Sequence, residues 1–119
     1  MSLESKIEMH PSGVVILLLE GRILTSEDFN RVNDLMDKAV NEGHRKFILP
    51  LDKVSHVNSS GLNLLLRLFT KARNKGGDLW MVAPSSGVDK LLKISKLNTV
   101  FNICANQTEA LNQLNAQEA

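Results

Sequence analysis

The sequence predicts one α/β domain, with a mixed, mostly parallel sheet of about five strands and about four helices packed on it. Apolar runs of strand length alternate with amphipathic runs of helical length, as in a sheet covered by helices. Glycine and proline separate these runs. The chain of 119 residues is long enough for one hydrophobic core, so we expect a single domain over residues 1–119, with an ordered core at about 4–114.

Two strands are expected within residues 5–20, joined by a turn at Pro11, Ser12 and Gly13. Residues 14–19 are apolar on both faces of a strand and begin with two valines. A strand with this pattern is buried on both sides. The second strand should therefore be central in the sheet.

The first helix is expected to begin at Thr25, whose hydroxyl can accept from free backbone amides while the Asp28 carboxylate reaches back. Gly43 can take the left-handed conformation that ends a helix. Residues 45–49 form the next strand, which Pro50 ends or places at an edge. The apolar positions of the helix share one face: Phe29, Val32, Leu35, Met36, Ala39 and Val40.

The second helix is expected over residues 60–74, followed by a strand at 79–82. Gly76 and Gly77 between them favour a helix stop. They do not form a phosphate-binding loop, because a strand follows where such a loop needs a helix.

The C-terminal third contains two pairs of residues at capping-box spacing, Ser86 with Asp89 and Asn106 with Glu109. Each pair predicts the start of a helix. The elements expected here are a helix through residue 94, a strand at 100–104, a helix through residue 114 and a frayed tail at 115–119.

Charge and composition exclude several functional classes. Fourteen Lys and Arg residues and thirteen Asp and Glu residues are scattered along the sequence, so no nucleic acid is expected as a partner. The apolar run at 14–19 is far shorter than the roughly 20 residues of a membrane span, and the N-terminus has no signal-peptide pattern, so we expect a cytoplasmic protein without membrane insertion. Cys104 is the only cysteine, which excludes an internal disulfide, and it is expected to be a small buried hydrophobe.

Function is expected where the second helix begins. Asn58, Ser59 and Ser60 can each cap this helix, and Gly61 lets the backbone turn tightly. Capping alone explains these residues, but one cap suffices, so a hydroxyl can remain for chemistry. A phosphate on it would add about −1.5 to −2 charges at the positive end of the helix dipole, where the fold tolerates an anion and a docked partner is repelled.

The second helix carries two apolar stripes. Leu64 and Leu68 lie on roughly the opposite side from the main stripe, beside Lys71 and Lys75. Two interpretations are open: these leucines pack against a neighbouring helix, or they form a partner-binding patch close to Ser59. The main stripe comprises Leu62, Leu65, Leu66, Phe69 and Ala72.

A small serine hydrolase is a weaker hypothesis. Asp52, His56 and Ser59 have the side chains of a catalytic triad. However, all three lie in one short loop, without a G-x-S-x-G elbow or an oxyanion loop, so His56 is better explained as a surface loop residue. His10 and His44 have no neighbouring ligands at metal-binding spacing, so neither a metal nor a cofactor is expected.

Residues 54–62 read V-S-H-V-N-S-S-G-L and match the second half of a family loop motif that ends V-x-x-x-D-S-[ST]-G-L. Gly21 with Arg22, Gly76 with Gly77, and residues 91–97 match further family positions. On these residues the chain resembles, over nearly its whole length, the STAS domain of bacterial anti-sigma factor antagonists.

The resemblance implies a non-enzymatic partner switch. The unphosphorylated antagonist binds an anti-sigma factor that is also a serine kinase, phosphorylation of the first serine of the pair breaks the complex, and a PP2C-type phosphatase resets the cycle. That serine is Ser59 here. The implied docking surface comprises His56, Asn58, Ser59, Ser60, Gly61, Leu62, Leu64 and Leu68.

Three acidic residues usual in the family are replaced, by Asn58 before the serine, by Pro50 at the end of the preceding strand and by Leu24 after Gly21 and Arg22. Carboxylates are therefore missing from positions expected near one surface. The alternative function is a non-phosphorylated STAS subunit or scaffold bound to another ATPase, such as that of an ABC lipid transporter. In that case Ser59 serves only as a cap or contact.

Overall fold

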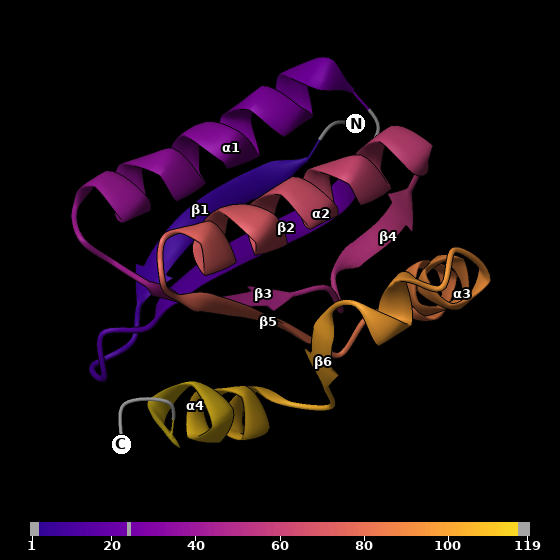
Figure 1. Cartoon of the computed structure of the whole chain (residues 1–119). Helices are drawn as coiled ribbons and strands as arrows, with labels where there is room; N and C mark the ends of the chain where they lie inside the picture. The colour runs from indigo at the N-terminus through magenta and orange to yellow at the C-terminus, as the bar shows by residue number, and fades with distance from the viewer. Residues whose placement is uncertain (1–2, 24, 117–119) are drawn as a thin grey trace.

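The computed structural model describes residues 3–23 and 25–116, and it shows one compact α/β domain (Figure 1). The sheet is mixed and mostly parallel and four α-helices pack on it, which confirms the predicted fold class. The elements follow in the order β1 (Glu4–Met9), β2 (Val15–Ile23), α1 (Ser26–Asn41), β3 (Lys46–Pro50), β4 (Val54–Val57), α2 (Ser59–Asn74), β5 (Asp78–Val82), α3 (Ser86–Ile94), the 3₁₀ helix η1 (Leu97–Thr99), β6 (Asn102–Cys104) and α4 (Gln107–Ala116).

The sheet has six strands, one more than expected. Five follow the order β1-β2-β3-β5-β6, and β4 pairs with β2 outside this path. Among the strand pairs of residues 3–23 and 25–116, only β1 and β2 are antiparallel. The sequence did not predict β4 because this strand has only four residues, of which Ser55 and His56 are exposed, so it lacks the apolar run of a longer strand.

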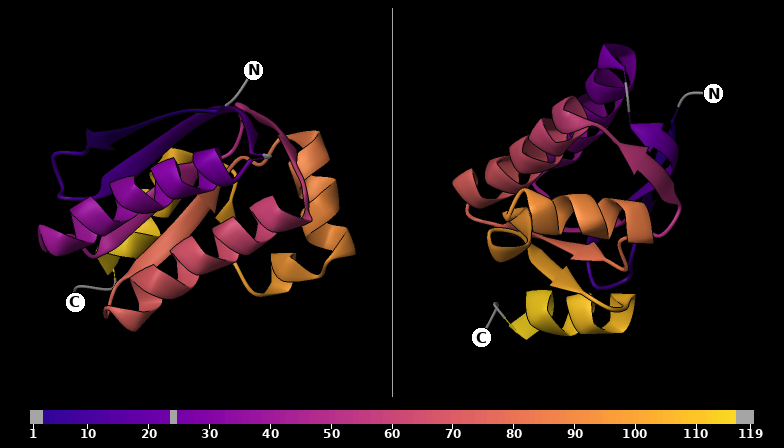
Figure 2. Two further views of the ribbon diagram at one scale, coloured as in Figure 1. Left: turned by 90° about the horizontal axis from the view of Figure 1, so that it is seen from above. Right: turned by 90° about the vertical axis from the view of Figure 1, so that its right-hand side faces the viewer.

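Helices cover both faces of the sheet. Figure 2 shows α1 and α2 side by side on one face and α4 on the opposite face. Alternate residues of β2 are buried in two separate clusters: Val15, Leu17 and Leu19 belong to the cluster with α1 and α2, whereas Ile16 packs with α4. This confirms that β2 is central, since it also pairs with β1, β3 and β4. No helix within 3–23 and 25–116 is long and apolar enough to span a membrane.

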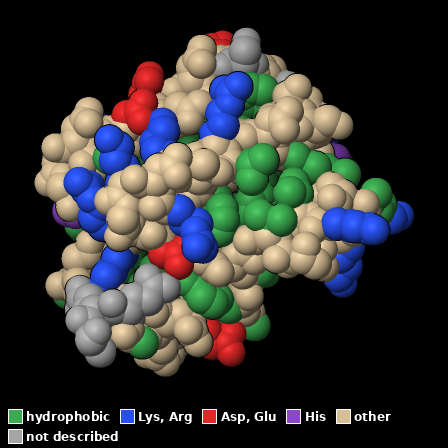
Figure 3. Space-filling view, viewed as in Figure 1, with side chains coloured by type: hydrophobic (Ala, Val, Ile, Leu, Met, Phe, Trp, Pro, Cys, Tyr) green, Lys and Arg blue, Asp and Glu red, His purple; other side chains and the backbone are tan. Residues whose placement is uncertain are grey.

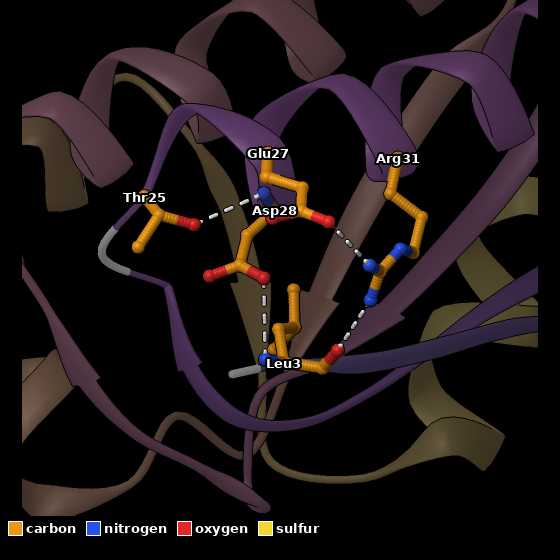
Figure 4. Close-up of polar contacts among 5 residues, drawn as sticks. All are labelled: Leu3, Thr25, Glu27, Asp28 and Arg31. Atoms are coloured by element: carbon orange, nitrogen blue, oxygen red, sulfur yellow. Dashed lines mark hydrogen bonds and ion pairs between the residues drawn. The ribbon is translucent and has the colours of Figure 1, made fainter. Parts of the chain in front are cut away.

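The start of α1 fixes the first strand to the helix layer (Figure 4). Thr25 caps the helix as predicted, because its Oγ1 accepts from the backbone N–H of Asp28 at 3.2 Å. The Asp28 carboxylate does not reach back to Thr25. It is 1% exposed and accepts from the backbone N–H of Leu3 at 3.3 Å. Arg31 donates to the Leu3 carbonyl at 3.0 Å and pairs with Glu27 at 3.6 Å, so both backbone groups of Leu3 are held by α1.

The capping box predicted from Ser86 and Asp89 does not form. The N-cap is Ser85, one residue earlier, and its hydroxyl donates to the Val54 carbonyl at 2.6 Å instead of capping the helix. Asp89 pairs with Lys93 at 2.9 Å. The packing of α3 against β4 thus decides the use of the Ser85 hydroxyl, which local sequence does not reveal.

The start of α4 confirms the other capping prediction. The Asn106 side chain accepts from the backbone N–H of Glu109 at 2.9 Å, and the Glu109 carboxylate accepts from the N–H of Ala105 at 3.1 Å. The helix continues through Ala116, so residues 115 and 116 are helical and not frayed. Residues 117–119 of the expected tail lie outside the described residues.

The leucine patch predicted on the exposed side of α2 is not formed. Leu64 and Leu68 are 2% and 0% exposed. The reason is the neighbouring α1, which packs beside α2 on the same face of the sheet and covers the second stripe (Figure 1). Of the main stripe, Leu66 is only partly buried. Packing against a neighbouring helix is therefore the correct interpretation of Leu64 and Leu68.

We expect Leu68→Ala to lower the free energy of unfolding by about 2–5 kcal/mol, because it leaves a cavity under two helices. Leu66→Ala is the same substitution on the same helix. It should lower the free energy of unfolding by about 1 kcal/mol or less, because the Leu66 side chain is partly exposed. Urea unfolding followed by circular dichroism measures both values. Equal costs would contradict the placement of the two leucines.

The stop after α2 brings two backbone segments into close contact. Gly76 has a φ of +85°, as expected for a helix end. A Cβ atom on Gly77 would lie 1.8 Å from the carbonyl oxygen of Arg45, and this oxygen also accepts from the backbone N–H of Asp78 at 2.9 Å. Only glycine fits at position 77 without moving the backbone at the start of β3.

Gly77→Ala should therefore lower the free energy of unfolding by about 3 kcal/mol or more, since backbone atoms must shift. Gly87→Ala is the matched control. Its Cβ would lie 3.3 Å from the Ser55 carbonyl, and alanine favours a helix, so its effect should stay within about 1 kcal/mol. A Gly77→Ala protein as stable as wild type in thermal unfolding would refute this contact.

Candidate functional site

The candidate site lies where β4 leads into α2, and the split pairing of β2 positions it. The first residues of β2 pair with β3, whereas residues 21–23 pair with β4. The register shifts between Gly21 and Arg22, where Gly21 has a φ of +117°. Arg22 then faces His56 and Ile23 faces Val57 in the register. The end of β2 thus supports the strand that carries the chain to Asn58 and Ser59.

Asn58 is the N-cap of α2. Its side-chain oxygen accepts from the backbone N–H of Gly61 at 2.8 Å, and its carbonyl accepts from the N–H of Leu62 at 3.0 Å. The helix begins at Ser59, one residue earlier than expected. Both Ser59 and Ser60 are exposed, and neither hydroxyl has a hydrogen-bond partner among the residues that the structure describes. The cap therefore uses the amide of Asn58 and leaves both hydroxyls available.

Gly61 lets α2 approach the sheet closely. It is buried, and a Cβ atom there would lie 2.6 Å from Cγ1 of Val57 and 2.8 Å from the carbonyl oxygen of Ile23. We expected this glycine to allow a tight turn, but it lies in the first turn of the helix. Its role is to remove a clash, so the first turn of α2 sits against the ends of β2 and β4.

The side chains that suggested a hydrolase do not assemble into a triad. Nδ1 of the exposed His56 lies 3.0 Å from Oγ of Ser55, which donates to the Gly21 carbonyl at 3.3 Å. Within the described part of the chain, His56 makes no hydrogen bond to Ser59 or to Asp52. Nucleophilic activation of Ser59 by this histidine therefore has no support in the geometry.

Metal-binding residues do not cluster within the described ranges, where no group of three His, Cys, Asp or Glu side chains could hold an ion. Cys104 is partly buried, not fully buried as expected, and its Sγ lies 3.3 Å from the Asn106 carbonyl. Burial raises the pKa of this thiol above its ordinary value, which disfavours the reactive thiolate.

Of the three replaced family acids, the structure describes the positions of Pro50 and Asn58. Pro50 lines a cleft of about 580 Å³ together with Glu20, Asp52 and Lys53, next to the start of β1. No residue of the junction from 54 to 62 lines this cleft. Leu24 lies outside the described residues. Of the two positions that the structure describes, Asn58 belongs directly to the site at Ser59.

The sequence did not indicate that α3 borders this site. The Ser85 hydroxyl is bonded to the Val54 carbonyl at 2.6 Å, and the backbone of Gly87 approaches that of Ser55. These contacts place the first turn of α3 against β4, in view beside β4 in Figure 1. Because the residues are about thirty positions apart in the chain, only tertiary packing brings them together.

The sequence and the fold are similar to those of known regulators. An anti-sigma F factor antagonist from Paenibacillus polymyxa is 30% identical over 115 residues, which cover 96% of this chain and 97% of that protein. The crystal structure of an anti-sigma factor antagonist from Mycobacterium paratuberculosis aligns with a TM-score of 0.82 at 19% identity, over 96% of this chain and 95% of the other. The phosphorylated form of the Bacillus cell fate determinant SpoIIAA aligns with a TM-score of 0.71 at 22% identity, over 92% of this chain and 98% of the other.

The sequence model of the STAS domain family matches residues 7–110, a range that includes every strand from β2 to β6 and the whole junction from β4 to α2. The chain therefore belongs to the STAS domain family.

Proposed function

We propose that this protein is an anti-sigma factor antagonist that binds an anti-sigma factor with serine kinase activity and is released when Ser59 is phosphorylated. One observation carries the proposal: Ser59 is exposed at the first residue of α2 and its hydroxyl is not used by the fold, because Asn58 caps the helix. The relative from Paenibacillus polymyxa, named an anti-sigma F factor antagonist, and the phosphorylated form of SpoIIAA support it by similarity.

The local electrostatics suit a reversible phosphate. The first turn of α2 contains no acidic residue, and the helix dipole presents partial positive charge there. A phosphoserine with about −1.5 to −2 charges is tolerated at this position without unfolding the helix. A partner bound to the same surface would have to remove water from the phosphate or place its own groups beside the new charge. Phosphorylation therefore weakens the complex and leaves the fold of the protein intact. A PP2C-type phosphatase in the cytoplasm then removes the phosphate.

The docking surface is centred on exposed polar groups. His56, Asn58, Ser59 and Ser60 are all exposed at the junction. Gly61 and Leu62 lie beneath them and support the first turn of α2. Leu64 and Leu68 are no longer part of the proposed surface because both are buried. The protein contributes a recognition surface and no catalytic group.

The division of roles between Asn58 and Ser59 predicts different effects on stability. Asn58→Ala should lower the free energy of unfolding by about 1 kcal/mol, because the N–H of Gly61 loses its acceptor. Ser59→Ala should leave the free energy of unfolding unchanged within about 0.5 kcal/mol. Chemical denaturation of both variants tests this. A Ser59→Ala protein that is as destabilised as Asn58→Ala would show that the serine is structural.

Phosphorylation is tested with the purified chain and the ATP-binding anti-sigma factors of its own organism. In the presence of Mg²⁺ and ATP, intact-mass analysis should show one added phosphate that fragment mapping assigns to Ser59. Ser59→Ala should accept none, whereas the matched control Ser60→Ala should accept one. The phosphorylated chain should bind the anti-sigma factor at least about 100-fold more weakly, since a like charge and its desolvation cost a few kcal/mol.

The same variants separate the proposed function from its alternative. The protein is isolated from its native cells under phosphatase inhibition, in several growth and stress conditions. Absence of phosphate at Ser59 in all of them would contradict the switch. Unchanged binding of Ser59→Asp and Ser59→Ala to another ATPase, such as that of an ABC lipid transporter, would identify a permanent STAS scaffold.

A further inference from the structure

The charges form no block of like sign, but they are unevenly divided along the chain, although the net charge is only +1. Residues 53–108 contain eight Lys or Arg residues and two acidic residues, which gives a net charge of +6. Residues 1–52 contain six Lys or Arg residues and nine acidic residues. The basic segment includes all of α2, α3 and η1, and α2 itself has no acidic residue. The cations are Lys53, Arg67, Lys71, Arg73, Lys75, Lys90, Lys93 and Lys96.

Part of this charge is compensated. Lys71 pairs with Asp37 of α1, Lys93 pairs with Asp89, and Arg73 lies 3.9 Å from Asp78. Lys90 and Lys96 are exposed and form no ion pair with any residue in the described ranges. The surface that α2 and α3 share is therefore positively charged.

An apolar area lies within this basic surface. Figure 3 shows hydrophobic side chains gathered between the positions of α2 and α3, with Lys and Arg side chains on both sides. Ile94 is 68% exposed and Val100 is 49% exposed, and among the large apolar side chains of the described residues Met9 follows at 47%. The α3 patch, as we call it, comprises Leu91, Ile94, Leu97 and Val100.

The floor of this area is formed by packed aromatic side chains. Phe69 of α2 and Phe101 are 5% exposed and stack edge to face with ring centroids 5.4 Å apart. The Arg73 guanidinium lies 5.4 Å from the centre of the Phe69 ring. These contacts join α2 to the segment after η1, so the apolar side chains of the α3 patch stand on a packed base.

The helix that carries the α3 patch also borders the site at Ser59, because the first turn of α3 packs on β4 and β4 leads directly into α2. Apolar side chains flanked by unpaired lysines fit a partner whose apolar residues are flanked by carboxylates. A second copy of the chain does not fit in a face-to-face arrangement, since that would bring the lysines together.

We infer that the α3 patch and its lysines bind an acidic amphipathic segment of the partner protein. The inference rests on the proposed function for the identity of that partner, the anti-sigma factor. It adds a physical basis for release, because a phosphate on Ser59 has the same sign as the acidic segment bound at the adjoining surface. Binding should accordingly weaken as salt concentration rises.

The first test needs no knowledge of the partner. The isotope-labelled chain is titrated with a helical peptide that has a leucine face and a glutamate face, and separately with its lysine counterpart. We expect the acidic peptide alone to shift the amide signals of residues 90–100. Ile94→Ser with Val100→Ser should weaken this binding at least about tenfold. Met9→Ser, with nearly the same exposure at Met9 as at Val100, is the matched control and should bind as wild type.

Three results would overturn the inference: no shift with the acidic peptide, equal shifts with both peptides, or shifts outside the α3 patch. Binding to vesicles of anionic phospholipid in place of the peptide would also overturn it, because the patch would then recognise a membrane surface.

The second test uses the anti-sigma factor and separates the two proposals. If Ile94→Ser weakens its binding while Ser59→Asp has no effect, the patch is correct and the phosphorylation switch is wrong. If Ser59→Asp releases the partner while Ile94→Ser and Lys90→Glu bind as wild type, the switch is correct and the patch is wrong. If Ile94→Ser and Ser59→Asp each weaken binding of the anti-sigma factor, both proposals are supported.

Discussion

Burial of β2 on both faces is the constraint on which the rest of the fold depends. The strand pairs with β1, β3 and β4, and its residues alternate between the cluster beneath α1 and α2 and the cluster beneath α4. A strand of this composition leaves apolar side chains in water unless helices cover each side of the sheet. The three-layer arrangement, and the position of α4 opposite the other helices, follow from that requirement.

The same strand also positions the junction between β4 and α2. Because β2 is longer than β3, its last residues remain free to pair with β4, and the irregularity at Gly21 directs them there. The short strand β4 then holds the first turn of α2, where Gly61 permits contact with the carbonyl of Ile23. Asn58 satisfies the helix end, so the hydroxyl of Ser59 is exposed to solvent at the first turn of α2. A modification at this position changes the surface and leaves the core intact.

The charge distribution gives this surface a character that the neutral composition conceals. Acidic side chains predominate before residue 53 and basic side chains after it, and the fold places the basic segment around α2 and α3. An acidic partner and a phosphate on the protein itself would compete for the same positive potential. Recognition and release can thus depend on one electrostatic property of one face.

The sequence by itself determined the alternation of strands and helices and the central place of β2, because both depend on local periodicity. It also determined the caps at Thr25 and Asn106 and the junction around Ser59, because these depend on neighbours within four residues. Tertiary structure alone decided the pairing of β4 with β2 and the hydrogen bonds of the Asp28 and Ser85 side chains to distant backbone groups. It also decided which apolar side chains are covered: Leu64 and Leu68 are buried under α1, whereas Ile94 and Val100 are exposed. The physical reason is that burial and hydrogen bonding at these positions depend on elements far away in the chain, and a helical wheel shows the stripes of a helix but not which of them a neighbour covers.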